Sequence, residues 1–378
     1  MKKVIAGCVA AVGVALLALT GCASAELSNQ GTSTTPPSTE APLSPSPDDT
    51  LHRPTGNPEA VVSNLEAPWS IARLDDGSAL ISQRDTGSII EVGPTGTARE
   101  AGYISDVVPN GEGGLLGIAL NPENPDELYA YYTSATDNRV VTMPLLGEGG
   151  SRSLGKATPI MTGIPKASIH NGGRIAFGPD GALYITTGDA SNPEDAQNPE
   201  SLAGKILRVN ADGSVPTDNP FPGSAVYTLG HRNVQGLAWT SDGRMWASEF
   251  GQSTWDELNL IKAGENYGWP EAEGSAGNTR FQDPVAQWKT TEASPSGLAA
   301  MGNTLFMASL RGECIWIIDV NQQEAEAEAW FNGDYGRIRD VVAGPGESLW
   351  FITNNTDGRG TPGTQKDTLY SIGISPAE

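Results

Sequence analysis

One short pattern of polar and hydrophobic positions recurs along most of this chain. An Asp-Gly pair is followed by residues with apolar side chains at alternating positions in 76–81 (DGSALI), 180–185 (DGALYI) and 242–247 (DGRMWA). Looser copies lie at 125–130 (PDELYA), 301–306 (MGNTLF) and 345–351 (PGESLWF). Each copy predicts a tight turn, with Gly where the backbone needs a positive φ, followed by a strand of period two.

The spacing of these copies indicates the architecture. Positions 77, 127, 181, 243, 303 and 347 are separated by 50, 54, 62, 60 and 44 residues, about the length of one four-stranded propeller blade with its loops. The pattern predicts an all-β fold, a six-bladed β-propeller with four-stranded antiparallel blades. A β-sandwich with incidental hairpins is the alternative, but it does not require one pattern at near-constant spacing.

The N-terminus is typical of a secreted protein. Met1, Lys2 and Lys3 precede an apolar stretch at 4–19, as in a secretion signal, and 19–22 (LTGC) resembles a bacterial lipobox with lipidation at Cys22. The alternative is an ordinary signal peptide with an incidental Cys. We expect a lipoprotein signal peptide at 1–21, a disordered Ser/Thr/Pro-rich stalk at 22–58 and a folded domain at 59–378. The protein would be secreted and lipid-anchored to the outer face of the bacterial cell membrane.

Composition narrows the possible partners. The chain has 23 Lys and Arg against 45 Asp and Glu, so its net charge is −22, and removing residues 1–21 with their two lysines makes it −24. This excess of acidic residues excludes nucleic acid as a partner, because phosphate binding needs a basic face. We expect the protein to contact the membrane only through its lipid anchor. With Cys22 acylated, Cys314 is the one thiol that remains. We expect Cys314 to be buried and inert, and a bound metal could add stability.

Two histidine loops are candidates for chemistry. His170 opens 170–174 (HNGGR) before the third hairpin, and His231 lies in 230–236 (GHRNVQG) before the fourth. A neutral imidazole can remove a hydroxyl proton, while Arg232 and Asn233 could hold an anionic or carbonyl-rich ligand. The alternative is that these side chains are hydrogen-bonded loop residues.

Two further groups could bind ligands. The loop 248–257 (SEFGQSTWDE), followed by 266–270 (NYGWP), offers oxygens of the kind that calcium binds, unless its acids are merely solvated. Arg311, Arg337 and Arg339 lie near strands of the last blades and could attract an anion into this acidic protein. The alternative is that each arginine pairs with a neighbouring acid such as Asp340.

Together these segments resemble the soluble glucose, sorbosone and aldose sugar dehydrogenases that depend on pyrroloquinoline quinone (PQQ). The segments that carry the resemblance are 113–117 (GGLLG), 170–174, 204–208 (GKILR), 230–236 and 266–270. The resemblance implies a six-bladed propeller that binds PQQ and Ca²⁺. It also implies oxidation of the C1 hydroxyl of an aldose to a lactone by hydride transfer to PQQ, with electrons passing to an external quinone or cytochrome.

The resemblance also implies residue roles around the cofactor. His170 matches the general base, and Arg232 with Asn233 matches the pair that holds PQQ and stabilises its reduced form. The basic positions that face the cofactor's carboxylates are matched by Arg311, Arg337 and Arg339.

The resemblance further implies two calcium sites and marks two departures. Gly251 and Gln252 match the backbone carbonyls of the calcium that polarises the cofactor, and Glu257 and Tyr267 match ligands of a structural calcium. Glu112 stands where glucose-oxidising members carry a Gln that contacts substrate and cofactor, and Ile169 stands where they carry an Asp beside the base.

Two other functions remain open from the sequence. One is a propeller that has lost PQQ and acts as a surface carbohydrate-binding or interaction module. The other is a calcium-dependent lactonase, because calcium at a propeller axis also suits hydrolysis.

Overall fold

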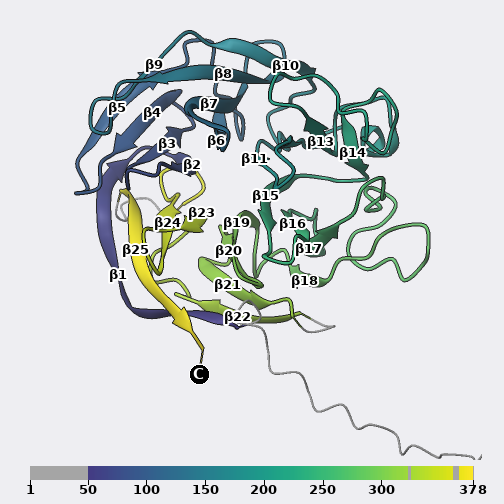
Figure 1. The fold of residues 1–378 in the computed structure, drawn as a ribbon. Coiled ribbons are helices and arrows are strands. Elements are labelled where there is room, and N and C mark those ends of the chain that lie inside the picture. Colours follow the sequence, from purple (N-terminus) through teal and green to yellow (C-terminus); the bar gives the residue numbers. More distant parts are fainter. Residues whose placement is uncertain (1–49, 322–324, 361–365, 378) are drawn as a thin grey trace, which may run out of the picture. The chain divides into compact units, whose positions relative to one another are not determined.

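The folded part of the chain that the structure describes consists of six antiparallel sheets arranged around a common axis (Figure 1). The structure is a computed structural model that describes residues 50–321, 325–360 and 366–377. Over these residues five sheets have four strands, and the sixth carries one additional short strand. The predicted six-bladed β-propeller is therefore confirmed.

The blades follow one another along the chain. The first contains β2 (Pro68–Arg73), β3 (Ala79–Gln83), β4 (Ser88–Val92) and β5 (Ala98–Tyr103). The second contains β6 (Leu115–Asn121), β7 (Asn124–Thr133), β8 (Asn138–Leu146) and β10 (Thr158–Ile164), with β9 (Ser153–Leu154) beside β8. The third contains β11 (Ile175–Phe177), β12 (Leu183–Thr186), β13 (Lys205–Val209) and β14 (Val226–Leu229), with the 3-10 helix η2 (Pro193–Gln197) before β13.

The remaining blades repeat this order. The fourth contains β15 (Val234–Trp239), β16 (Met245–Glu249), β17 (Trp255–Ile261) and β18 (Ala286–Lys289). The fifth contains β19 (Pro295–Met301), β20 (Thr304–Ser309), β21 (Cys314–Asp319) and β22 (Glu326–Trp330). The sixth contains β23 (Ile338–Ala343), β24 (Ser348–Thr353), β25 (Asp367–Pro376) and β1 (His52–Leu65).

Each recurring sequence phrase lies at the first hairpin of a blade. In the first blade Gly77 has φ +83°, and its N–H donates to the Leu74 carbonyl (3.2 Å). The Asp76 carboxylate accepts a hydrogen bond from the Ser78 N–H (2.9 Å), which fixes the turn. Asp180 and Asp242 accept equivalent bonds two residues ahead in the third and fourth blades.

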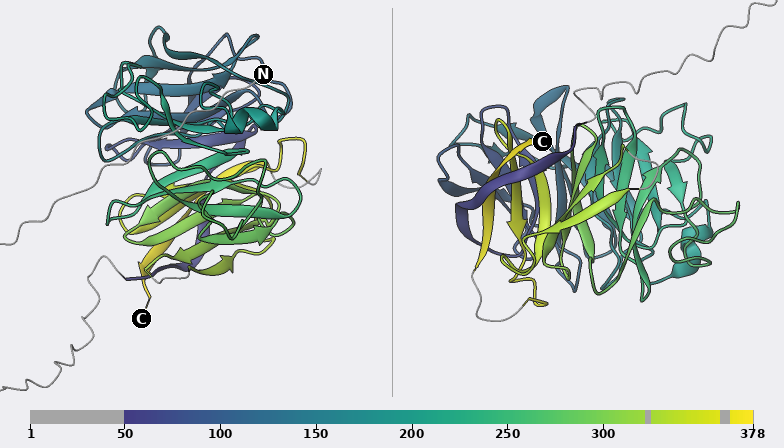
Figure 2. Two further views of the ribbon diagram at one scale, coloured as in Figure 1. Left: turned by 90° about the vertical axis from the view of Figure 1, so that its right-hand side faces the viewer. Right: turned by 90° about the horizontal axis from the view of Figure 1, so that it is seen from below.

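The ring closes through β1, which pairs with β25 (Figures 1 and 2). Residues 52–58 are therefore part of the propeller, and the folded domain begins earlier than the boundary expected at 59. Most side chains of this stretch are at least partly exposed, so main-chain pairing to a strand some 300 residues later, rather than a hydrophobic pattern, holds it. Cys22 and the rest of the expected signal and stalk up to residue 49 lie outside the described residues.

The hydrophobic core is divided among the blade interfaces. Six buried clusters can be traced in the described chain, and each joins neighbouring blades. In one of them Trp246 and Leu258 of the fourth blade pack with Leu305 and Met307 of the fifth. Each blade thus buries both of its faces only when the ring is complete.

Cys314 is buried as expected, and burial raises the pKa of its thiol to about 11.

None of the helices in the described ranges is both long and apolar enough to cross a bilayer.

A buried ion pair lies across the axis. Arg174 Nη1 is 3.0 Å from Asp340 Oδ2, and the same oxygen accepts the Ile71 N–H (2.9 Å). Arg174 also donates to the Gln235 carbonyl (2.9 Å) and to Ser70 Oγ (3.1 Å). These contacts link the innermost strands β2, β15 and β23 to the residue that precedes β11.

The pairing of β1 with β25 leads to a test by truncation. A chain that begins at Glu66 leaves β25 with an open edge, so we expect its melting temperature to fall by roughly 10 °C or more. A chain that begins at Thr50 is the control and should melt like the longer protein. Equal melting temperatures for the two truncated chains, measured by circular dichroism, would show that β1 does not hold the ring together.

Candidate active site

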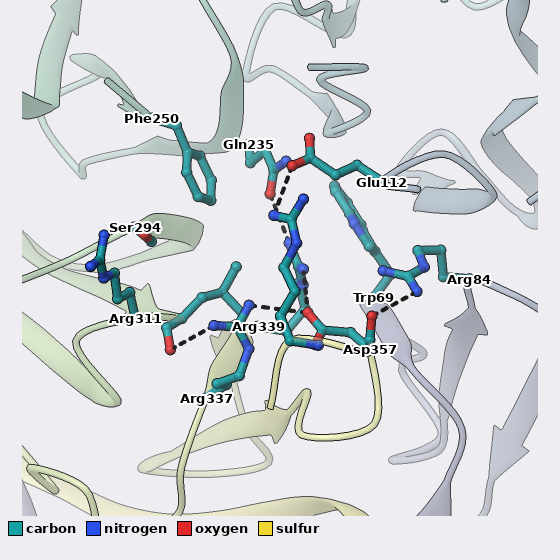
Figure 3. Close-up of a pocket in the computed structure, with 12 residues that line it drawn as sticks. Trp69, Arg84, Glu112, Gln235, Phe250, Ser294, Arg311, Arg337, Arg339 and Asp357 are labelled. Atoms are coloured by element: carbon teal, nitrogen blue, oxygen red, sulfur yellow. Dashed lines mark hydrogen bonds and ion pairs between the residues drawn. The ribbon is translucent and has the colours of Figure 1, made fainter. Parts of the chain in front are cut away.

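A pocket of about 340 Å³ lies at the end of the axis where the innermost strands begin (Figure 3). Trp69 of β2, Gln235 of β15 and Arg339 of β23 reach it from different blades. Its lining comprises Trp69, Arg84, Glu112, Gln235, Phe250, Ser294, Leu310, Arg311, Arg337, Arg339, Asp357 and Arg359. Five arginines thus face two carboxylates in a protein of net charge −22.

The three arginines singled out from the sequence come together here. Arg337 Nη2 lies 3.0 Å from Asp357 Oδ2, and Arg339 Nη2 lies 3.8 Å from the same oxygen. Burial opposes ionisation of Asp357, but the charges of Arg339 and Arg337 outweigh it and lower the pKa of Asp357. Asp340 pairs with Arg174 instead, because successive residues of a strand point to opposite sides.

Several guanidinium groups retain unused donors. The Nε atoms of Arg337, Arg339 and Arg232 are buried and have no hydrogen-bond partner. Burial also lowers the pKa of Arg339 to about 9. Arg311 is exposed and lies within ion-pair distance of no carboxylate of the described residues. Unused donors and positive charge fit a small ligand with several carboxylates.

Sequence reasoning missed several residues that line the pocket or support it. Arg84, Phe250 and Leu310 each follow the second strand of a blade directly, and Asp189 and Asp357 follow theirs within a few residues. A search for charged and aromatic residues at this repeated position would have found all of them except Leu310. The signal was present in the repeat, but it depends on knowing which strands are equivalent.

His170 lies between a carboxylate and a guanidinium. Its Nδ1 is 2.8 Å from Asp189 Oδ1, and its Nε2 is 2.8 Å from Arg232 Nη2. Arginine can only donate, so these contacts assign the proton to Nδ1 and leave a lone pair on Nε2. Burial opposes ionisation of Asp189, but hydrogen bonds from His170, Ser191 and Trp269 lower its pKa. Asp189 therefore supplies the orienting carboxylate that position 169, an Ile, lacks.

The backbone around His170 is held in an uncommon conformation. His170 has φ +59°, and its carbonyl accepts the Ala190 N–H (3.1 Å). Gly188 permits this approach, because a Cβ there would lie 2.0 Å from the His170 carbonyl oxygen. The His170 N–H donates to Glu112 Oε2 (2.8 Å), and the other oxygen of Glu112 pairs with Arg359 (2.8 Å). The anion at position 112 is thus balanced within the pocket.

The second histidine lies in the protein interior. His231 is fully buried, its Nδ1 lies 2.8 Å from Glu249 Oε2, and its ring stacks on Tyr267. Glu249 also accepts the N–H of Arg232 and so fixes the loop that carries it. Asn233 is buried, and its Oδ1 accepts the Gly172 N–H (2.9 Å), which ties the loops of the two histidines together.

The residues expected to bind calcium are only partly gathered. Gly251, Glu257 and Tyr267 line one cavity of about 10 Å³ with Glu249 and Glu273, whereas Gln252 is exposed and does not line it. The Tyr267 hydroxyl donates to the Leu260 carbonyl and accepts the Lys262 N–H, so it is already engaged in two hydrogen bonds.

The charge around this small cavity suits a cation. Burial and the nearby charge of Glu249 raise the pKa of Glu257 to about 8. In the described part of the chain no three His, Cys, Asp or Glu side chains are arranged to hold a metal ion. A calcium ion bound here would therefore use backbone carbonyls together with one or two carboxylates.

A buried lysine holds the loop that contains η2. Lys205 is fully buried, and its Nζ donates to the carbonyls of Asp195 (2.7 Å), Ala196 (3.0 Å) and Ala203 (2.7 Å). Burial lowers the pKa of Lys205 to about 8. Gln197, at the end of η2, donates to the Trp269 carbonyl (2.7 Å), and Trp269 in turn donates to Asp189 (2.9 Å). Lys205 thus supports the partner of His170.

We expect Lys205→Met to destabilise the fold strongly. Three buried carbonyls lose their donor, so the free energy of unfolding should fall by about 3 kcal/mol. Lys262→Met is the matched control, since Lys262 is exposed. Urea unfolding of both variants measures the difference, and equal midpoints would contradict the role of the three carbonyl bonds.

Comparison with known proteins agrees with this geometry. Residues 65–362 match the family model described as glucose/sorbosone dehydrogenase. The chain is 33% identical to quinoprotein glucose dehydrogenase B of Acinetobacter calcoaceticus over 62% of its length, an alignment that spans 56% of that protein. It is 29% identical to aldose sugar dehydrogenase YliI of Escherichia coli, over 80% of this chain and 91% of that one.

A solved structure is also similar. The PQQ-bound form of aldose sugar dehydrogenase from Streptomyces coelicolor superposes with a TM-score of 0.82 at 48% sequence identity. The match covers 87% of this chain and 99% of that one.

Proposed function

Because the chain belongs to the glucose/sorbosone dehydrogenase family, we propose that it is an oxidoreductase that converts aldose sugars to lactones with PQQ and Ca²⁺. The observation that carries the proposal is the arginine-rich pocket at one end of the axis, next to a histidine with a proton-free Nε2. An external quinone or cytochrome would receive the electrons. The PQQ-bound Streptomyces relative and the quinoprotein relative support the choice of cofactor.

The arginines of the pocket would hold the cofactor. Arg337 and Arg339 have buried Nε donors without partners, and Arg311 is free of nearby carboxylates in the described chain. These groups match the three carboxylates of PQQ in charge and in hydrogen-bonding type. When bound, PQQ would supply the acceptor for the hydride, and Ca²⁺ near Gly251 would polarise it.

His170 would act as the general base. The C1 hydroxyl of the sugar would replace Arg232 at His170 Nε2, and that nitrogen would accept the hydroxyl proton. Asp189, bound to Nδ1, would stabilise the resulting imidazolium, as a buried carboxylate does for a catalytic histidine. The displaced Arg232 guanidinium would remain near enough to stabilise negative charge that develops in the pocket.

We also propose the cellular location from the sequence. Cleavage before Cys22 and acylation of that residue would anchor the propeller to the outer face of the cell membrane. The sugar and the electron acceptor would then meet the protein outside the cell.

The first test is reconstitution. Purified protein is given PQQ and Ca²⁺, and reduction of a redox dye is followed with glucose and with other aldoses. We expect dye reduction that requires both additions and is lost after chelation of Ca²⁺. Absence of PQQ binding, with no sugar oxidised, would favour the carbohydrate-binding module. Hydrolysis of lactones with Ca²⁺ alone would favour the lactonase.

The second test concerns the base. His170→Gln should lower turnover by about 10²- to 10⁴-fold because the proton acceptor is lost, while PQQ binding stays largely intact. His52→Gln in β1, far along the chain from the site, is the matched control and should not change turnover. Normal turnover per bound cofactor in His170→Gln, combined with weaker PQQ binding, would contradict the assigned role.

A further inference from the structure

A second cavity, of about 320 Å³, lies at the opposite end of the propeller axis. Its walls come from later positions of the same innermost strands whose first residues reach the arginine-rich pocket. We call it the distal pocket. Most of its lining is apolar and includes Ile71, Ile118, Leu120, Phe177, Leu298 and Val342. The proposed oxidation of sugars assigns no role to the residues that line this cavity.

The distal pocket contains three charged residues. Arg73, Arg174 and Asp340 line it, so two cations face one carboxylate. Asp340 Oδ2 already accepts from Arg174 and from the Ile71 N–H. Arg73 donates to the Ala343 carbonyl (3.0 Å), and among the described carboxylates none lies within ion-pair distance of it; Asp75 acts on it only at longer range. One positive charge is therefore left over.

Two buried side-chain nitrogens of the arginines that line this cavity have no hydrogen-bond partner in the described chain, and both are donors. Arg174 is 6% exposed, and its Nη2 makes no hydrogen bond. The Nε of Arg73 is likewise buried and without a partner. Buried donors of this kind are normally paired, so a ligand that fills the pocket would have to offer acceptor oxygens.

We propose that the distal pocket binds a small monocarboxylate with an apolar body. The carboxylate would accept from the unpaired nitrogens of Arg174 and Arg73, which balances two cations against two anions. The apolar body would lie against the hydrophobic walls, as in most small-molecule sites. Neither a neutral sugar nor a small hydrophilic anion satisfies both features.

Trp69 contacts one arginine from each of the two pockets. Trp69 lines the arginine-rich pocket, and the guanidinium carbons of Arg174 and Arg339 lie 4.4 Å and 5.7 Å from its ring centre. Arg174 belongs to the distal lining and Arg339 to the other. A ligand in the distal pocket would thus bind without entering the arginine-rich pocket.

The test uses three probes and isothermal titration calorimetry on the folded protein without cofactor. Benzoate has both required features, acetate has only the charge, and benzyl alcohol has only the ring. We expect benzoate to bind about tenfold or more tightly than either of the others, because each of them lacks one contribution. Equal binding of acetate and benzoate, or no benzoate binding, would overturn the proposal.

Variants locate the site. Arg73→Gln removes the surplus charge and should weaken benzoate binding about tenfold, and Val342→Trp should fill the pocket and abolish binding. Arg311→Gln, in the arginine-rich pocket, is the matched control and should bind benzoate normally. Melting temperatures close to that of the parent protein verify that each variant is folded.

Two results would refute the assignment. Loss of benzoate binding in Arg311→Gln would place the ligand in the arginine-rich pocket, and unchanged binding in both Arg73→Gln and Val342→Trp would exclude the distal pocket. The measurement needs neither PQQ nor turnover. Its failure is therefore distinct from failure of the proposed dehydrogenase activity.

Discussion

The ion pair between Arg174 and Asp340 holds the innermost strands of the propeller, and the two ends of these strands line the two pockets. It lies across the axis, and its hydrogen bonds reach Ile71, Gln235 and Ser70 on neighbouring blades. A buried pair of this kind adds little net stability over a packed apolar core, but loss of one partner costs about 3–5 kcal/mol. It therefore acts chiefly by holding the innermost strands in one arrangement.

That arrangement concentrates positive charge in an acidic protein. Five arginines line one end of the axis, and the buried carboxylate of Asp357 holds two of them, Arg337 and Arg339, close together. Like charges would otherwise separate these side chains, so the cluster needs Asp357 as well as the rigid strands. The Nε atoms of both arginines have no hydrogen-bond partner in the described chain, so donors remain for a ligand that carries acceptor oxygens.

The His170 side chain is positioned by a series of contacts that begins at a residue distant from it in the chain. Lys205 fixes the loop that includes η2, Gln197 of that loop holds Trp269, and Trp269 with Asp189 fixes the tautomer of His170. Most of these contacts join different loops of the third and fourth blades. His170 lies in the loop that enters the third blade and Arg232 in the loop that enters the fourth, so two neighbouring blades are sufficient to bring these two side chains together.

The sequence by itself determined the number of blades, because each first hairpin repeats one local turn whose Gly and Asp act within a few residues. It also indicated His170 and the arginines 311, 337 and 339 as candidate site residues, because histidines and basic residues are few in this acidic chain. Only the tertiary structure decided which partners these residues have. Asp189 beside His170, Arg359 beside Glu112 and β1 beside β25 are contacts between segments distant in the chain, and no local pattern encodes them.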